Sequence, residues 1–147
     1  MDWSAQLFGL SEEFLNISGV GGGVLQTTAS EAALTAVVAA RTRYTKRHPD
    51  IPLDKMVLYV TTETHSLGTK AALILGLKCR ALKVKAEKNY SLDADVLKEA
   101  LKEDEAAGIH PFMLSECKRD TLNHWNSLRE FSCHCGDHEY WNDRQYR

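Results

Sequence analysis

Two short segments of the sequence combine hydroxyl, imidazole and backbone N–H groups in patterns that suit ligand binding. Residues 26–31 read QTTASE and precede a long stretch of small apolar residues. They would place hydroxyls and free N–H groups at a helix start, which suits a phosphate. Residues 61–66 read TTETHS and follow an apolar run, which puts His65 just beyond the carboxyl end of a strand. Ligands collect at that edge of parallel α/β sheets, so both segments are candidate binding sites.

Each segment also has a purely structural interpretation. Thr28 and Glu31 stand three residues apart before an apolar run, as the two members of a capping box do. On spacing alone, a plain cap is the commoner role. A hydrogen-bonded turn residue is likewise the commoner role for a histidine placed like His65. The residues alone leave both interpretations open.

A third cluster of possible ligands lies near the end of the chain. Cys133, His134 and Cys135 are followed by His138. These residue types can bind zinc, but Cys-x-Cys-x2-His lacks the paired spacing of common structural zinc modules. We therefore expect no metal site here.

The elements that must position these segments alternate along the chain. Three helices are predicted where small or apolar residues recur at helical spacing: one that begins at the possible capping box of Thr28 and Glu31 and has its body over 32–46, and two over 66–76 and 91–107. Three strands are predicted as short apolar or alternating runs, over 56–60, 80–85 and 111–114. Residues 19–23 (GVGGG) are expected to form a flexible entry to the first helix. This order predicts an α/β fold in three layers around a mostly parallel sheet.

Composition changes near Leu114. Residues 115–147 contain no alanine, valine or isoleucine, yet they hold three of the four cysteines and two of the three tryptophans. Three common core-building residue types vanish where rare types accumulate. We therefore predict a folded part over 1–114 and an irregular or disordered tail over 115–147.

Charge and hydropathy exclude several classes of partner. The 18 basic and 20 acidic side chains leave a net charge of −2. That balance argues against a surface that coats nucleic acid and against a polybasic membrane anchor. No apolar run approaches the ~20 residues of a membrane span, and the first residues do not read as a secretion signal. We expect a cytoplasmic protein.

Three ordered segments resemble the central part of one enzyme family. They read GGGVLQTTASEAALTAVVAARTRY, LYVTTETHSLGTKAALILGL and LDADVLKEALKEDEAAGIHPFML, and MDWSAQLFGLSEEF is similar to the segment that precedes them in that family. Residues 3–114 thus resemble the group II pyridoxal-phosphate-dependent amino-acid decarboxylases, which include the aromatic-L-amino-acid, tyrosine and histidine decarboxylases. The resemblance implies a fragment of the large domain of a type I pyridoxal-phosphate-dependent transferase fold, and a homodimer.

The resemblance also implies pyridoxal 5′-phosphate as the cofactor and assigns roles at matching positions. Ala29 and Ser30 match the residues that bind the cofactor phosphate through a backbone amide and a hydroxyl, and Thr28 lies beside them. His65 matches the histidine that stacks on the pyridine ring and helps to position the substrate carboxylate. The family reaction releases carbon dioxide from an amino acid and leaves an amine.

Two residues that the family requires have no match in the sequence. The aspartate that pairs with the pyridinium nitrogen and the Schiff-base lysine would both lie beyond Leu114, and no lysine here has the Asn-x-His-Lys setting. We therefore expect a truncated chain that is inactive alone. Because the tail from Ser115 shows no resemblance, we expect it to arise from a retained intron or a frame shift, which sequencing of the transcript would test.

Three alternatives stay open at this point, one of which is a zinc-binding tail that metal analysis would check. Another enzyme of the same cofactor fold, such as an aminotransferase or a cysteine desulfurase, would share much of this pattern. A non-catalytic binding or regulatory chain could instead pair with a full-length homologue. The amino-acid substrate cannot be predicted, because the residues that shape the side-chain pocket lie largely outside the matching segments.

Overall fold

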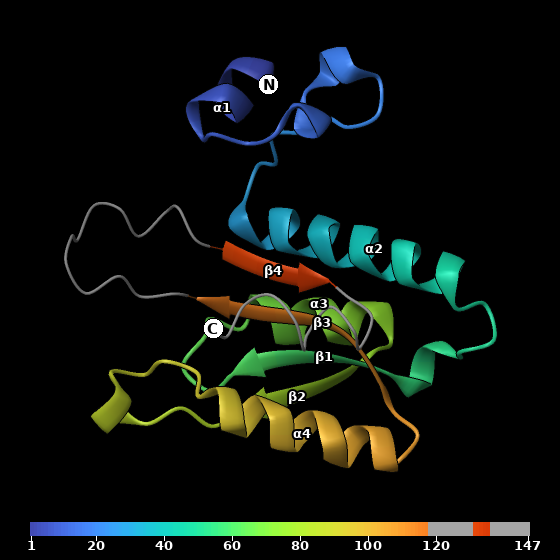
Figure 1. The fold of residues 1–147 in the computed structure, drawn as a ribbon, viewed down its shortest axis with the longest axis vertical. Helices are drawn as coiled ribbons and strands as arrows, with labels where there is room; N and C mark the ends of the chain where they lie inside the picture. Colours follow the sequence, from blue (N-terminus) through green and yellow to red (C-terminus); the bar gives the residue numbers. More distant parts are fainter. Residues whose placement is uncertain (118–130, 136–147) are drawn as a thin grey trace. The chain divides into compact units, whose positions relative to one another are not determined.

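The first part of the chain forms short helical turns that one carboxylate ties together. The computed structural model describes residues 1–117 and 131–135 and divides into two units, Met1–Ala32 and Ala33–Arg147 (Figure 1). In the first unit, α1 (Asp2–Leu7) is followed by the 3-10 turns η1 (Glu12–Phe14) and η2 (Asn16–Ser18). The Asp2 carboxylate accepts hydrogen bonds from the backbone N–H and the side-chain amide of Asn16, both at 2.8 Å. The sequence patterns predicted none of these turns.

One position of the glycine-rich segment after these turns lies close to the backbone of η1. A Cβ atom at position 21 would lie 1.8 Å from the carbonyl oxygen of Glu13. Only glycine permits so close a backbone approach. Gly21 therefore lies directly against the turn at η1, while the expected flexibility of residues 19–23 stays a prediction.

The second unit is built on a four-stranded sheet with the strand order β2-β1-β3-β4. The strands are β1 (Met56–Thr61), β2 (Lys78–Leu82), β3 (His110–Cys117) and β4 (Phe131–Cys135). β1 pairs in parallel with both β2 and β3, whereas β4 pairs antiparallel to β3. β1 lies between the strands β2 and β3, and helices cover it on both faces of the sheet. All six of its residues are therefore buried.

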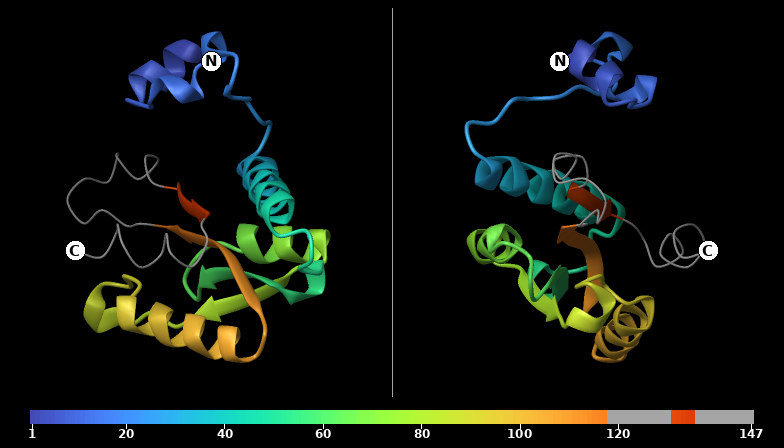
Figure 2. Two further views of the ribbon diagram at one scale, coloured as in Figure 1. Left: turned by 45° about the vertical axis from the view of Figure 1, so that its right-hand side comes forward. Right: turned by 90° about the vertical axis from the view of Figure 1, so that its left-hand side faces the viewer.

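Helices cover both faces of this sheet, as the views in Figure 2 show. On one face, α2 (Ala29–Arg47) and α3 (Leu67–Leu75) contribute small side chains such as Ala40 and Ala71 to a core with Leu58 and Phe112. On the other face, α4 (Ala94–Ala106) packs Leu97 and Leu101 against Tyr59. The predicted three-layer α/β arrangement is confirmed.

Local contacts set the exact ends of the elements. α2 begins at Ala29, directly after its cap Thr28, which confirms the start predicted from the capping box. α4 begins at Ala94 rather than at residue 91, because the Asp93 side chain caps it by accepting from the Asp95 N–H at 3.3 Å. β2 covers 78–82 instead of 80–85, because its pairing with β1 ends at the pair Thr61–Leu82. Two further 3-10 turns, η3 (Leu53–Lys55) and η4 (Ala86–Lys88), lie between the larger elements.

The structure differs from the expected irregular tail in two places. β3 continues beyond Leu114 to Cys117, and β4 adds a strand beside it. The two strands are paired from Met113, opposite Cys135, to Cys117, opposite Phe131. Their backbone N–H and C=O groups can therefore hydrogen-bond to one another. The division of the chain into a part over 1–114 and a tail over 115–147 itself stays a prediction. In the described part of the chain, no helix combines the length and apolar character needed to cross a membrane.

Candidate functional site

The first turn of α2 is capped by Thr28. The Thr28 hydroxyl oxygen accepts a hydrogen bond from the Glu31 N–H at 3.2 Å, and its carbonyl accepts from the Ala32 N–H at 3.1 Å. This confirms the predicted pairing of positions 28 and 31. The Thr28 hydroxyl oxygen thus caps the helix as an acceptor, while its own O–H can still donate to a ligand.

The Glu31 side chain departs from the usual capping box. It reaches back past Thr28 to Thr27, where its carboxylate accepts from the N–H at 3.2 Å and also from the hydroxyl. The carboxylate therefore uses the residue before the cap instead of the cap itself. This contact holds the chain at Thr27 against the start of the helix.

Ala29 and Ser30 supply the unused donors of this turn. The first N–H groups of an α-helix have no carbonyl partner within the helix. Among the described residues, the N–H groups of Ala29 and Ser30 and the half-buried Ser30 hydroxyl make no hydrogen bond. Three donors are thus grouped at the positive end of a 19-residue helix, which is an arrangement that suits an anion.

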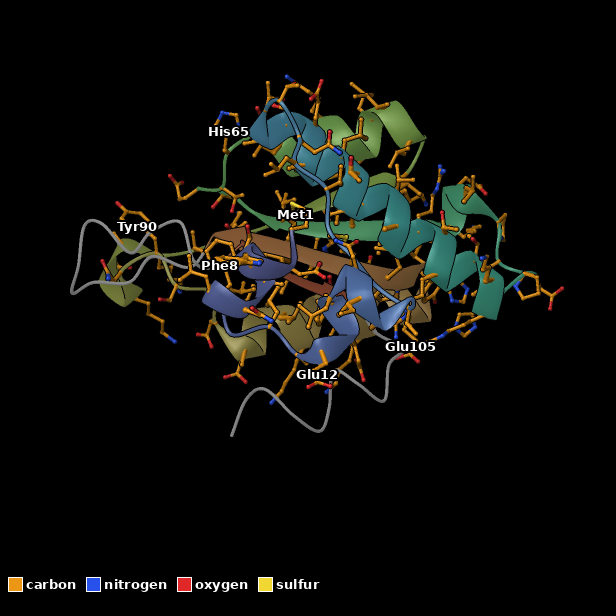
Figure 3. The ribbon with its side chains drawn as sticks, turned by 90° about the horizontal axis from the view of Figure 1, so that it is seen from above. Met1, Phe8, Glu12, His65, Tyr90 and Glu105 are labelled. Atoms are coloured by element: carbon orange, nitrogen blue, oxygen red, sulfur yellow. The ribbon has the colours of Figure 1, made fainter. Side chains whose placement is uncertain are left out.

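His65 lies in the turn that joins β1 to α3. Its side chain is exposed and points outward (Figure 3), so its ring is accessible to a ligand. The preceding turn is closed by the Thr64 N–H, which donates to the Thr61 carbonyl oxygen at 3.2 Å. The histidine therefore follows the carboxyl end of a buried strand, as the sequence predicts.

The predicted site residues fall into two groups. Thr28, Ala29 and Ser30 share the first turn of α2 in the first unit, whereas His65 belongs to the second unit. Their assigned roles toward the cofactor stay predictions.

A buried polar cluster elsewhere in the second unit escaped the sequence patterns. The Tyr59 hydroxyl donates to the Asp104 carboxylate at 2.5 Å, and the same carboxylate pairs with Arg80 at 2.9 Å. Burial raises the pKa of Tyr59, and the hydrogen bond to Asp104 and its negative charge raise it further. The available signal was the position of Asp104 on the same helix face as Leu97, Ala100 and Leu101.

The possible metal ligands can be placed only in part. The cluster of Cys133, His134, Cys135 and His138 lies outside the residues whose side chains the structure describes. Within the described residues, no group of three or more histidine, cysteine or acidic side chains could hold a metal ion.

Comparison with known sequences defines the class of protein. The family described as "Pyridoxal-dependent decarboxylase conserved domain" matches residues 1–141 of the 147. The chain belongs to this family of enzymes, whose cofactor is pyridoxal phosphate. The match extends past Leu114, into the segment that was expected to lie outside the family.

Individual relatives within the family act on amino acids, as their names state. The chain is 39% identical over 117 residues to Tryptophan decarboxylase 2 of Oryza sativa subsp. japonica, covering 78% of this chain and 23% of the relative. It is 40% identical over 123 residues to Aromatic-L-amino-acid decarboxylase of Rattus norvegicus, covering 78% and 25%. The chain thus spans about a quarter of the length of these relatives.

Solved structures give the same result for the fold. A crystal structure of Oryza sativa TDC with PLP and tryptamine matches with a TM-score of 0.67 at 36% identity, over 77% of this chain and 24% of that chain. Rhodiola rosea 4-hydroxyphenylacetaldehyde synthase matches with a TM-score of 0.68 at 34% identity, over 77% and 25%. The chain is thus an α/β fragment of a type I pyridoxal-phosphate-dependent fold.

Proposed function

We propose that this chain supplies the phosphate-binding turn and one ring-facing side chain of a pyridoxal-phosphate-dependent decarboxylase. The observation that carries the proposal is the group of unused donors on Ala29 and Ser30 at the start of α2. A phosphate presents several strong acceptor oxygens and a negative charge, so these donors and the helix dipole fit it. The residues present therefore suit the phosphate end of the cofactor.

His65 would act on the ring of the cofactor. An exposed imidazole can stack on an aromatic face and shield it from water, while a ring N–H donates a hydrogen bond to a substrate carboxylate. When bound, the cofactor supplies the electron sink for the electrons left behind as carbon dioxide departs. In this proposal, His65 orients the cofactor ring and the substrate carboxylate and forms no covalent bond with either.

The names of several relatives favour an aromatic substrate. Tryptophan decarboxylase 2 and Tyrosine decarboxylase 2 are each 39% identical to this chain over the matched residues. The Aromatic-L-amino-acid decarboxylase of Rattus norvegicus is 40% identical. We therefore propose an L-amino acid with an aromatic side chain as the substrate and an amine as the product. An assay of a longer product of the same gene would separate this from the aminotransferase alternative, because only decarboxylation releases carbon dioxide.

The 147-residue chain would bind cofactor without turning over substrate. None of its lysines has the Asn-x-His-Lys setting that the sequence comparison implies for the covalent attachment of the cofactor. We expect no carbon dioxide from L-tryptophan or L-tyrosine when the purified chain is supplied with pyridoxal phosphate. Formation of amine would contradict this expectation.

Calorimetric titration with pyridoxine phosphate tests the binding proposal. This analogue lacks the aldehyde, so it cannot react with the chain's surface lysines. We expect Ser30→Ala to weaken binding about five- to tenfold, because a hydrogen bond to a charged group is lost. Thr42→Ala is the matched control on the same helix, since its hydroxyl only donates to the Val38 carbonyl oxygen. Equal affinity for pyridoxine and pyridoxine phosphate would contradict the proposal.

Pairing with a second chain is a second candidate function, favoured by the apolar surface of the first unit. Trp3, Ile17 and Val20 are exposed by 88, 85 and 87%. Large apolar side chains that are exposed to this degree favour association with another protein surface. We propose that they contact a second copy of the chain or a full-length homologue.

Light scattering over a concentration series tests this second candidate. We expect a dimer mass that Trp3→Ser shifts toward the monomer, while Leu73→Ser, at an 81% exposed apolar residue on α3, leaves it unchanged. A monomer at every concentration, with no co-purification of a homologous decarboxylase, would contradict the proposal.

A further inference from the structure

The turn that carries His65 contains a pair of threonine hydroxyls. Thr61 is the last residue of β1 and is buried, and Thr64 is half-buried three residues later. Their Oγ1 atoms are hydrogen-bonded to each other, with either hydroxyl able to donate. The Thr64 N–H also donates to the Thr61 carbonyl oxygen at 3.2 Å. Side chains and backbone thus close the same four-residue turn twice.

The turn is also attached to the neighbouring strand. The Thr62 N–H donates to the Leu82 carbonyl oxygen at 2.9 Å, which extends the pairing of β1 with β2 by one residue. The Val84 N–H approaches the Thr62 hydroxyl oxygen at 3.4 Å. The chain therefore leaves the sheet along a fixed path.

Beyond His65, the chain is held against the sheet again. Leu67 is buried, and a Cβ atom on Gly68 would lie only 2.7 Å from Cγ1 of Val60 in β1. The first turn of α3 therefore lies directly on β1. His65 and Ser66 are the exposed residues between two fixed points, Thr64 and Leu67.

We infer that Thr64 is a positioning residue for His65, acting through its hydroxyl contact with Thr61. This inference rests on the proposed function, in which His65 faces the cofactor ring. Fixing the backbone on both sides limits where the imidazole can lie, while the ring itself stays free to meet a ligand. Ordering the histidine in advance would reduce the entropy lost when a ligand binds.

Replacement of either hydroxyl tests the inference. Thr64→Val keeps the side-chain shape and removes the hydrogen bond, whereas Thr64→Ser keeps the hydroxyl. We expect Thr64→Val to lower the NMR order parameter of the His65 amide from about 0.85 toward 0.6, the range of flexible backbone, and Thr64→Ser to restore it. Binding of pyridoxine phosphate should weaken about three- to tenfold in Thr64→Val and return to within about twofold in Thr64→Ser.

A second variant separates the hydroxyl pair from general damage to the fold. Thr61→Val should reproduce the effect of Thr64→Val, and the double variant should be no worse than either, because both remove one shared interaction. Thr69→Val, at an exposed position on α3, is the control and should leave the His65 order parameter unchanged. If Thr64→Val does not fold, Thr61→Val carries the same test.

The readouts distinguish this inference from the proposed function. An unchanged His65 order parameter in both valine variants would overturn the positioning role. A lowered order parameter, with binding unaffected by both Thr64→Val and His65→Ala, would support the positioning of His65 and contradict the proposed contact with the cofactor.

Discussion

The buried hydroxyl of Tyr59 makes the stability of the sheet depend on pH in the alkaline range. Its pKa is raised above the ordinary value of 10.0, first by burial and then by Asp104. In the unfolded chain the hydroxyl ionises near that ordinary value, while in the folded chain it keeps its proton. The folded state therefore binds more protons above pH 10, and its stability falls as the pH rises.

Urea unfolding between pH 9 and 11 measures this effect. We expect the free energy of unfolding to fall above about pH 10, by up to about 1.4 kcal/mol per pH unit from this one group. Tyr59→Phe cannot ionise at this position and should show a shallower fall. Parallel curves for the two proteins would contradict the account.

Single residues of the candidate site could be predicted where local spacing carries the signal. The pairing of Thr28 with Glu31 follows from a separation of three residues, and the place of His65 follows from the apolar run before it. The hydroxyl pair of Thr61 and Thr64 could not be predicted, because a sequence does not show how a turn folds back on its strand. The contact of Asp104 with Tyr59 joins residues 45 positions apart and depends on tertiary packing.

At the scale of elements, the polar cluster fixes α4 to the sheet. Asp104 lies on α4, Tyr59 on β1 and Arg80 on β2, so one carboxylate joins three elements. Arg80 also donates to the Ala100 carbonyl oxygen at 3.2 Å and pairs with Glu103 at the surface. These polar contacts hold α4 at a fixed position along the sheet, in addition to the packing of its apolar face.

Alanine substitutions at the two acidic residues separate the buried pair from the surface pair. We expect Asp104→Ala to lower the free energy of unfolding by ~2–3 kcal/mol, because Tyr59 and Arg80 lose their shared partner. This is less than a fully buried pair loses, since the Arg80 side chain is 33% exposed. Glu103→Ala removes only an exposed partner and should cost less than ~0.5 kcal/mol. Equal losses in urea unfolding would contradict this assignment.

Element types were predictable, whereas element ends depended on contacts. The apolar run over 56–60 and the periodic face of 91–107 were strong signals, and both elements formed. The end of β2 is set by where β1 stops, and the start of α4 is set by the Asp93 cap. Such limits come from partners that a local pattern does not contain.

At the scale of the whole molecule, the order of helices and strands predicted the layered sheet, and the family comparison confirmed its class. The first unit was not predicted, because its turns rest on polar contacts such as those of Asp2 and have no periodic apolar face. The chain spans about a quarter of the length of the relatives it matches.

Residue-resolved NMR with added pyridoxine phosphate shows whether the first turn of α2 binds the cofactor phosphate. We expect the amides of Ala29 and Ser30 to show the largest shifts, and Ser30→Ala to reduce these shifts while Thr42→Ala does not. Shifts centred on the surface lysines, with Ala29 and Ser30 unaffected, would contradict this binding.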